Sequence, residues 1–354
     1  MKTLHWRIPR WKESPFWYIA VPLVAIVLLF LANLFIGSVY IPADAVIDIF
    51  MGKEAEKATW SFIVLQSRFP QAVTALFVGA SLAVAGLMLQ TVFNNPLAGP
   101  SILGIDSGAC LGVALVMLFL GGSLGTAGSF QLSGSIAVVL AAFAGAVLIL
   151  GIIILFSTWV QSNIMLLIIG IMMGYITSSV ISLLNFFATA EGVFSYTLWG
   201  MGNFAGVSLK QLPFFCTLLT AGLLIAVLLI KPLNALLLGE RYAENLGVNV
   251  RLTRIWLLIG TGVLTAVSTA FCGPVSFIGL AVPHMARLWM GSSNNKWLLP
   301  VTLFLGAAIA LLCNLVSVMP GSSGIIPLNA ITPVLGAPVI IYVIVNQKKI
   351  QYFN

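Results

Sequence analysis

The sequence contains few charged residues and few residues of the kinds that bind metals. Only 7% of the 354 residues are charged, and the chain has two histidines and four cysteines. The cysteines stand singly within apolar runs without CxxC spacing, so we interpret them as small core residues rather than disulfides or ligands. His5 and His284 are too few for a histidine-built metal site. The sequence therefore predicts no metal in this chain.

Patterns typical of other transporters and of enzymes are also missing. No GxxxxGK[ST] phosphate loop occurs, so we do not expect the chain to bind ATP in the P-loop manner. The apolar runs lack the paired acids that ion-coupled carriers use, and Asp106 is the one candidate there. A carrier driven by an ion gradient stays open as an alternative. A polytopic membrane enzyme is the weaker alternative, because it would need clustered acids or histidines near one interface.

The chain is instead rich in apolar sequence, with 60% hydrophobic residues and a mean hydropathy of +1.10. So much apolar surface requires lipid as solvent, and continuous rather than alternating runs favour helices over a barrel. We predict an all-α polytopic membrane protein that forms one transmembrane domain over residues 1–354. About ten runs approach the ~20 residues that cross a bilayer. They cover residues 17–39, 69–93, 102–120, 136–156, 164–187, 212–230, 255–271, 275–290, 297–318 and 325–345.

The basic residues predict the orientation. An even number of spans places both termini on one side, and Lys and Arg concentrate in cytoplasmic segments. With cytoplasmic termini, 12 of the 16 basic residues lie inside. The other four, Lys53, Lys57, Arg68 and Lys210, lie outside. The net charge of +7 therefore reflects topology and does not indicate nucleic-acid binding.

The segment 231–254 concentrates charge between two long apolar runs. Six of the 25 charged residues of the chain fall within its 24 positions, and the predicted topology places it in the cytoplasm. Residues 240–246 can form a short helix between Gly239 and Gly247. Its apolar and acidic positions alternate with helical spacing, which a simple charged linker, the alternative interpretation, would not need.

Small and polar residues mark three further places. Gly79, Gly86 and nearby alanines predict close helix packing in the second run, and a similar texture in the seventh suggests that the two halves could form an inverted repeat. Asp106 follows the Pro- and Gly-rich segment 94–104, where we expect it at a helix start. A stripe on one face of the fifth run favours either a pathway lining or close helix packing. The stripe consists of Gly170, Gly174, Thr177, Ser178, Ser182 and Asn185.

Seven segments, taken together and in order, resemble the permease subunits of ABC importers for iron-siderophores, haem and vitamin B12. They are RFPQ at 68–71, GASLAVAGLMLQ at 79–90, NNPLAGPSILGIDSGA at 94–109, LWGMGNFAGVS at 198–208, LNALLLGERYAENLGV at 233–248, FCGPVSFIGLAVPHMARLWMG at 271–291 and LGAP at 335–338. The chain departs from the family at Gly99, Asn314 and Val318, and at Pro327–Asn329, where PLN replaces the usual PVG.

The resemblance implies a ten-span permease in a bacterial inner membrane, paired with a second permease subunit, which would be an identical chain in a homodimer. Two ATP-binding cassette subunits would dock inside, holding the ATP and Mg²⁺, and a substrate-binding protein would dock outside. The chain itself would be a transport subunit without enzymatic activity or cofactor. The substrate would be an iron-siderophore, haem or a cobalamin.

The resemblance also implies roles for particular residues. The loop matching residues 240–247 would form the coupling helix on the ATPase, with Glu240, Arg241, Ala243, Glu244, Leu246 and Gly247 as its members. Ser157, Asn163 and the stripe of the fifth run would line and gate the pathway. Lys53, Lys57, Arg68 and Lys210 are candidates for docking the binding protein, with ordinary solvated charge as the alternative.

Overall fold

The computed structural model describes residues 16–53, 56–120, 131–160, 162–319 and 326–345. Throughout these ranges the regular secondary structure is helical, with no strand, which confirms the all-α prediction. Several residues used above lie outside the described ranges, namely His5, residue 325 and the basic residues before 16 and after 345.

Every predicted run corresponds to a helix. The helices are α1 (Phe16–Phe35), α4 (Phe69–Val92), α5 (Ile105–Ala114) continued by η3 (Leu115–Leu120), α7 (Gln131–Trp159), α8 (Asn163–Phe187), α10 (Leu212–Leu228), α13 (Val250–Cys272), α14 (Ile278–Met290), α15 (Asn295–Ser317) and α16 (Leu328–Val345). Within the described ranges, six helical stretches are long and apolar enough to cross a membrane alone, and α10 with α11 (Ile230–Leu236) makes a seventh if the pair, bent by 51°, is one span. The α5–η3 segment and α16 are shorter apolar helices, and α14 has 13 residues.

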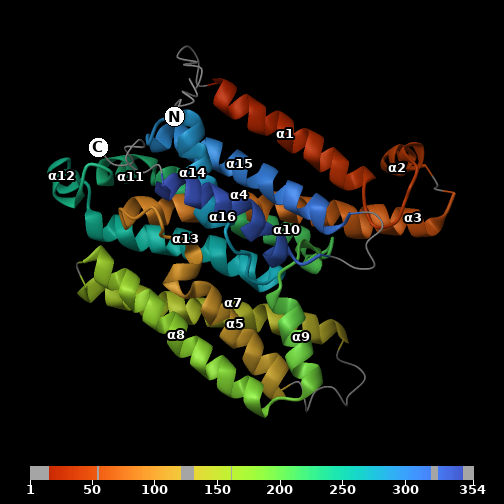
Figure 1. The fold of residues 1–354 in the computed structure, drawn as a ribbon, viewed down its shortest axis with the longest axis horizontal. Coiled ribbons are helices and arrows are strands. Elements are labelled where there is room, and N and C mark those ends of the chain that lie inside the picture. Colours follow the sequence, from red (N-terminus) through yellow and green to blue (C-terminus); the bar gives the residue numbers. More distant parts are fainter. Residues whose placement is uncertain (1–15, 54–55, 121–130, 161, 320–325, 346–354) are drawn as a thin grey trace, which may run out of the picture.

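Helix α4 forms the centre of the fold. It packs against α15, α13, α14 and α10 (Figure 1). In the helical stretch Ala58–Val92 that contains α4, 83% of an 18-residue apolar segment is buried. Glycines make these contacts close, because a Cβ at Gly79 would collide with the carbonyl of Gly306 on α15. At Gly86 the same addition would collide with Gly279 on α14. The small residues of the second run therefore do what the sequence predicts, since in lipid close packing replaces the hydrophobic drive.

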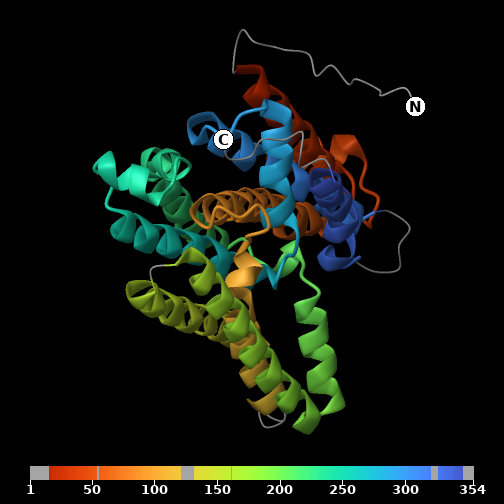
Figure 2. The same ribbon diagram turned by 60° about the vertical axis from the view of Figure 1, so that its left-hand side comes forward.

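Helices α5, α7 and α8 form a second group beside this centre (Figure 2). Gly108 on α5 and Gly145 on α7 approach each other so closely that neither position has room for a Cβ. Helix α8 lies at the surface of this group, and only 17% of its 18-residue apolar segment is buried within the chain. A helix so exposed meets lipid or a partner along most of its length.

Several short helices were not predicted. Helices α2 (Ala43–Phe50), α3 (Ala58–Phe62) and the π-helix η1 (Ile63–Arg68) precede α4, and α3, η1 and α4 make one helical stretch of 35 residues. The others are η2 (Pro100–Leu103), α9 (Ala190–Gly200), η4 (Phe204–Gly206) and α11. In Figure 1, α2 and α3 lie at one end of the bundle, and α11 and α12 (Glu240–Asn245) lie at the other.

Candidate functional site

Helix α12 confirms the short helix that the sequence predicts in the charged loop. It runs from Glu240 to Asn245, between Gly239 and Gly247, which both take positive φ angles of 101° and 83° that favour glycine. Ala243 is fully buried against the protein. Tyr242 of the helix and Leu246 just after it face outward and are 53% and 59% exposed. Arg241 and Glu244 are exposed as well.

The first residue of α12 is tied to the membrane helices. Glu240 Oε1 accepts a hydrogen bond from Asn163 Nδ2 and an ionic one from Arg254 Nη2, both at 2.8 Å. Asn163 is the first residue of α8, and Arg254 lies in the first turns of α13. The Arg254 side chain is 8% accessible, and that of Glu240 is 41% accessible. One carboxylate oxygen thus joins the charged loop to two helices.

The same contacts reach two more helices. Asn163 Nδ2 also donates to the carbonyl of Val92 at the end of α4, at 2.8 Å. Arg254 Nη1 donates to the carbonyl of Val160 just beyond α7, at 3.4 Å. We call Glu240, Asn163 and Arg254 with these two carbonyls the inner junction. The structure therefore brings together Asn163 and Glu240, which the sequence assigned to separate parts of the site, and adds Arg254.

The stripe on α8 divides between the two alternatives. Gly170 packs against the backbone of Ile102 and Leu103 in η2, and Thr177 is buried with its hydroxyl bonded to its own helix. Ser178 and Ser182 are exposed among apolar neighbours. The stripe therefore serves close packing on its inner side and presents hydroxyls on its outer side.

The other predicted residues of this region lie on α8 and at the end of α7. Gly174 lies beside Ser107 of α5, and Asn185 is half-buried near the opposite end of α8. Ser157 is buried near the end of α7.

His284 and Arg287 form hydrogen bonds inside the fold. Both are buried on α14. Arg287 Nη1 donates to the side-chain oxygen of Gln90 on α4, and His284 Nε2 lies 2.6 Å from the carbonyl of Pro96. These bonds fix the turn after α4 to α14. Sequence reasoning missed them because the partners lie about 190 positions away.

Asp106 lies in the first turn of α5, as predicted, and is buried. Its Oδ2 accepts from the Ser101 hydroxyl and its Oδ1 from the Thr269 hydroxyl of α13, both at 2.7 Å. Both carboxylate oxygens are thus engaged by protein hydroxyls, which links α5 to α13. Among the described residues, no group of three or more His, Cys, Asp or Glu side chains is placed to hold a metal ion.

The four basic residues that the sequence predicts on the outside behave in two ways. Lys53, Lys57 and Lys210 are exposed, with Lys53 paired to Asp48 at 2.7 Å and Lys57 over the ring of Trp60. Arg68 was also predicted to dock the binding protein, but the structure corrects this prediction, because the residue is only 6% exposed. Its guanidinium donates to the carbonyls of Leu34 and Phe35, both at 2.9 Å, and to that of Val39. It caps the end of α1 instead of offering a charge to a partner.

Two of the departures from the family form hydrogen bonds. Asn314 Nδ2 on α15 donates to Asn33 Oδ1 on α1 at 2.8 Å, and both asparagines are buried. Asn329 Nδ2 on α16 donates to the carbonyls of Gly200 (3.1 Å) and Pro274 (2.8 Å), and its Oδ1 accepts from the amide of Ser276. Asn329 therefore clamps the start of α16 to the links that follow α9 and α13.

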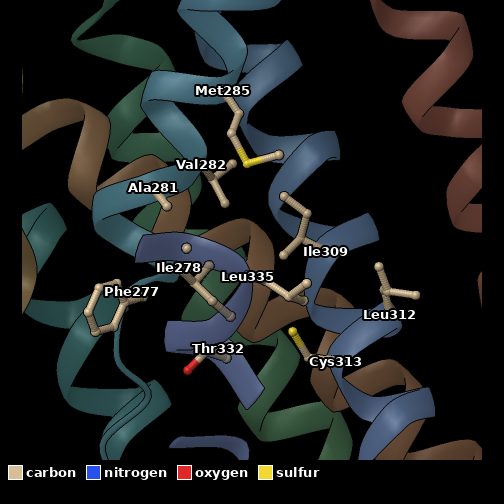
Figure 3. Close-up of a pocket in the computed structure, with 11 residues that line it drawn as sticks. Phe277, Ile278, Ala281, Val282, Met285, Ile309, Leu312, Cys313, Thr332 and Leu335 are labelled. Atoms are coloured by element: carbon tan, nitrogen blue, oxygen red, sulfur yellow. The ribbon is translucent and has the colours of Figure 1, made fainter. Parts of the chain in front are cut away.

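Two hollows among the described residues differ in size and position. A pocket between α14, α15 and α16 has a volume of about 130 Å³ and apolar walls from residues such as Ile278, Met285 and Leu335 (Figure 3). Sites for drug-sized ligands occupy roughly 300–1,000 Å³. A wider, open hollow of about 570 Å³ lies beside α12, between Lys231, Leu246 and Trp256. Most of the residues that line this hollow lie in the charged segment 231–254.

Comparisons with known proteins agree with this architecture. A model of the FecCD transport family matches residues 25–346. The vitamin B12 import system permease protein BtuC of Klebsiella pneumoniae is 34% identical over 337 residues, which cover 95% of this chain and 96% of the relative. BtuC of Serratia proteamaculans is 34% identical over 85% of each chain. A solved inward-facing structure of a metal-chelate type ABC transporter matches with a TM-score of 0.79 at 29% identity, covering 95% of this chain and all of that one.

Proposed function

This chain belongs to the FecCD transport family and is a permease of the BtuC and FecCD type, and we propose that it is the membrane subunit of an ATP-driven importer. In this proposal it carries a large metal chelate inward and does no chemistry on it. The substrate is an iron-siderophore, haem or a cobalamin, and the vitamin B12 relatives make a cobalamin the first to test. The chain lies in a bacterial inner membrane with both termini in the cytoplasm.

The observation that supports an ATPase partner is the exposed face of α12. Tyr242 and Leu246 are exposed on one short helix and its C-terminal end, and exposed apolar side chains that lie together favour a surface that another protein covers. The open hollow beside Leu246 extends the same face. We propose that an ATP-binding cassette subunit docks here, and that ATP and Mg²⁺ bind to that subunit and not to this chain.

The outer face of α8 supports a second permease subunit. Ser178 and Ser182 are exposed on this face, with the Ser182 hydroxyl donating to the carbonyl of Ser178 at 2.9 Å, and their small polar side chains suit a subunit interface beside a water-filled pathway. A homodimer with the pathway between two copies of α8 accounts for the low burial of this helix within one chain. We also propose that a substrate-binding protein docks on the outside through the exposed Lys53, Lys57 and Lys210.

Reconstitution tests the proposal directly. The purified permease in liposomes, with its ATPase and binding protein, should take up cyanocobalamin or a ferric siderophore only when ATP is supplied. The double variant Arg241→Glu, Leu246→Ala should lose ATPase binding, because it reverses a charge and removes an apolar contact on the exposed face. Uptake by the permease alone, or undisturbed assembly of the double variant, would contradict the proposal.

The ion-driven carrier remains the alternative that this experiment must separate. It would require Asp106 to exchange protons or ions, although both of its oxygens are already bonded to Ser101 and Thr269. In the proposed importer, ATP depletion at a constant ion gradient stops uptake. If uptake continued without ATP and Asp106→Asn abolished it, the carrier would be the correct assignment.

A further inference from the structure

Helix α12 is attached to the rest of the chain at few points. Among its six residues, Ala243 is buried, and Glu240 holds Asn163 and Arg254. The other four side chains are exposed. A displacement of α12 therefore reaches the membrane helices through the packing of Ala243 and the side chain of Glu240, and through the chain connections at each end.

These two attachments differ in what they can transmit. The contact of Ala243 is a single methyl group against apolar neighbours, which can slide. Glu240 instead makes two short bonds in fixed directions, and one of them is charge-assisted to a largely buried guanidinium. Such bonds are directional, so they resist lateral movement more than an apolar contact does.

The partners of Glu240 lie where the sequence and the family resemblance place the inner gate. Asn163 is the first residue of α8, the helix with the exposed hydroxyl stripe, and Arg254 reaches the carbonyl of Val160 at the end of α7. Both protons of the Asn163 amide are committed, one to Glu240 and one to Val92 of α4. The start of α8 is therefore held between the core helix α4 and the movable helix α12.

We propose that Glu240 is the positioning residue that transmits movement of α12 to the inner ends of α7 and α8. When a docked subunit shifts α12, Glu240 pulls Asn163 directly and Val160 through Arg254, so that α8 moves relative to α4. This proposal rests on the proposed function, because the movement of α12 comes from the docked ATPase. The proposal about Glu240 goes beyond the proposed function because it names the side chain through which the movement is transmitted.

The test measures movement of α8 in the assembled complex. Spin labels at Met165→Cys on α8 and Lys296→Cys on α15, in a background without the four native cysteines, report the distance between α8 and the core. In this background with Glu240 intact, ADP-vanadate should shift the distance relative to the nucleotide-free state. With Glu240→Ala the shift should disappear, and uptake per ATP hydrolysed should fall by about tenfold or more, while the ATPase stays bound.

A second variant approaches the junction from the membrane side and does not touch the docking face. Asn163→Ala should abolish the shift as Glu240→Ala does, and the double variant should lose no more than either single one, since both lie on one route. Glu240→Asp, which keeps the charge, should retain part of the shift. The matched control is Glu191→Ala, which removes an exposed first-turn glutamate from the short helix α9.

Three results would count against the proposal or its premise. An unchanged shift and uptake in Glu240→Ala, or in Asn163→Ala, would refute the transmission route. Loss of ATPase binding in Glu240→Ala would show that Glu240 acts in docking, which refutes the positioning role but keeps the proposed function. If the protein with Glu240 intact does not bind an ATPase at all, the proposed function itself fails.

Discussion

The close contact between α4 and α14 yields a prediction whose size follows from geometry. A Cβ added at Gly86 would lie 2.9 Å from the Cα of Gly279, and its nearest contact, the carbonyl oxygen of Gly279, would be closer still. Ordinary van der Waals contact begins at 3.4 Å, so the two helices must separate by at least 0.5 Å (3.4 minus 2.9). Neither side can relieve the clash by rotating a side chain, because both atoms belong to backbone.

The expected cost can be isolated with a matched variant. Overpacking of this kind costs about 1–3 kcal/mol, while Gly→Ala within a helix gains about 1 kcal/mol of propensity. At Gly151 on α7, an added Cβ meets nothing within 4 Å, so only the gain applies. Because the propensity gain is common to both, Gly86→Ala should be about 1–3 kcal/mol less stable than Gly151→Ala.

The assay is reversible unfolding in mixed detergent micelles, titrated with SDS and followed by circular dichroism. Gly151→Ala should have a midpoint above that of the parent protein, and Gly86→Ala should have one at or below it, because its net loss is about 0–2 kcal/mol. Equal midpoints for Gly86→Ala and Gly151→Ala would show that α4 and α14 do not pack as closely as described. A loss in both variants would refute the assignment of Gly151 to an open surface.

Three further changes test the contacts that the sequence did not reveal. Arg68→Met should lower the free energy of unfolding by at least about 2 kcal/mol, because it leaves the carbonyls at the end of α1 without their donor. The control Lys53→Ala should change the free energy of unfolding by less than about 1 kcal/mol. Equal effects of the two substitutions would show that Arg68 is not a cap. Asn314→Leu should cost about 1–2 kcal/mol in the same titration, and adding Asn33→Leu should cost less than its own single effect, so strict additivity would count against the pair. Asn329→Ala should speed hydrogen exchange at the amides of Gly202 and Asn203, near the carbonyl that it binds, and unchanged exchange there would mean that the clamp is not formed in solution.

The helices could be predicted because each apolar run is a local property of the sequence. Lipid imposes a length near 20 residues, so α4, α8, α13 and α15 were found within a few positions. Helix α12 was predicted from two glycines and helical spacing. Helices α2, α3 and α9 were missed because none of them spans a bilayer alone, and short helices form chiefly through the tertiary contacts that hold them.

Pairing over long distances in the sequence could not be predicted. A basic residue at the edge of an apolar run suggests solvent, yet Arg68 is buried because the end of α1 lies against it. In the same way, nothing near Glu240 indicates that Asn163 and Arg254 share its carboxylate. The residue types of the site could be inferred from the family resemblance, but their connection into the inner junction required the structure.

The helical stretch from Ala58 to Val92 has a consequence for the surface at its Ala58 end. Its 35 residues span about 52 Å at 1.5 Å per residue, against a hydrocarbon thickness of about 30 Å. Set along the bilayer normal, the stretch would extend roughly 20 Å beyond the hydrocarbon core, into the headgroups and the water, and it continues into the centre of the bundle. A protein that binds to this extension meets a surface that is already ordered, so binding costs little entropy for ordering that surface. If the bound protein tilts the extension, α4 at the centre of the bundle tilts with it.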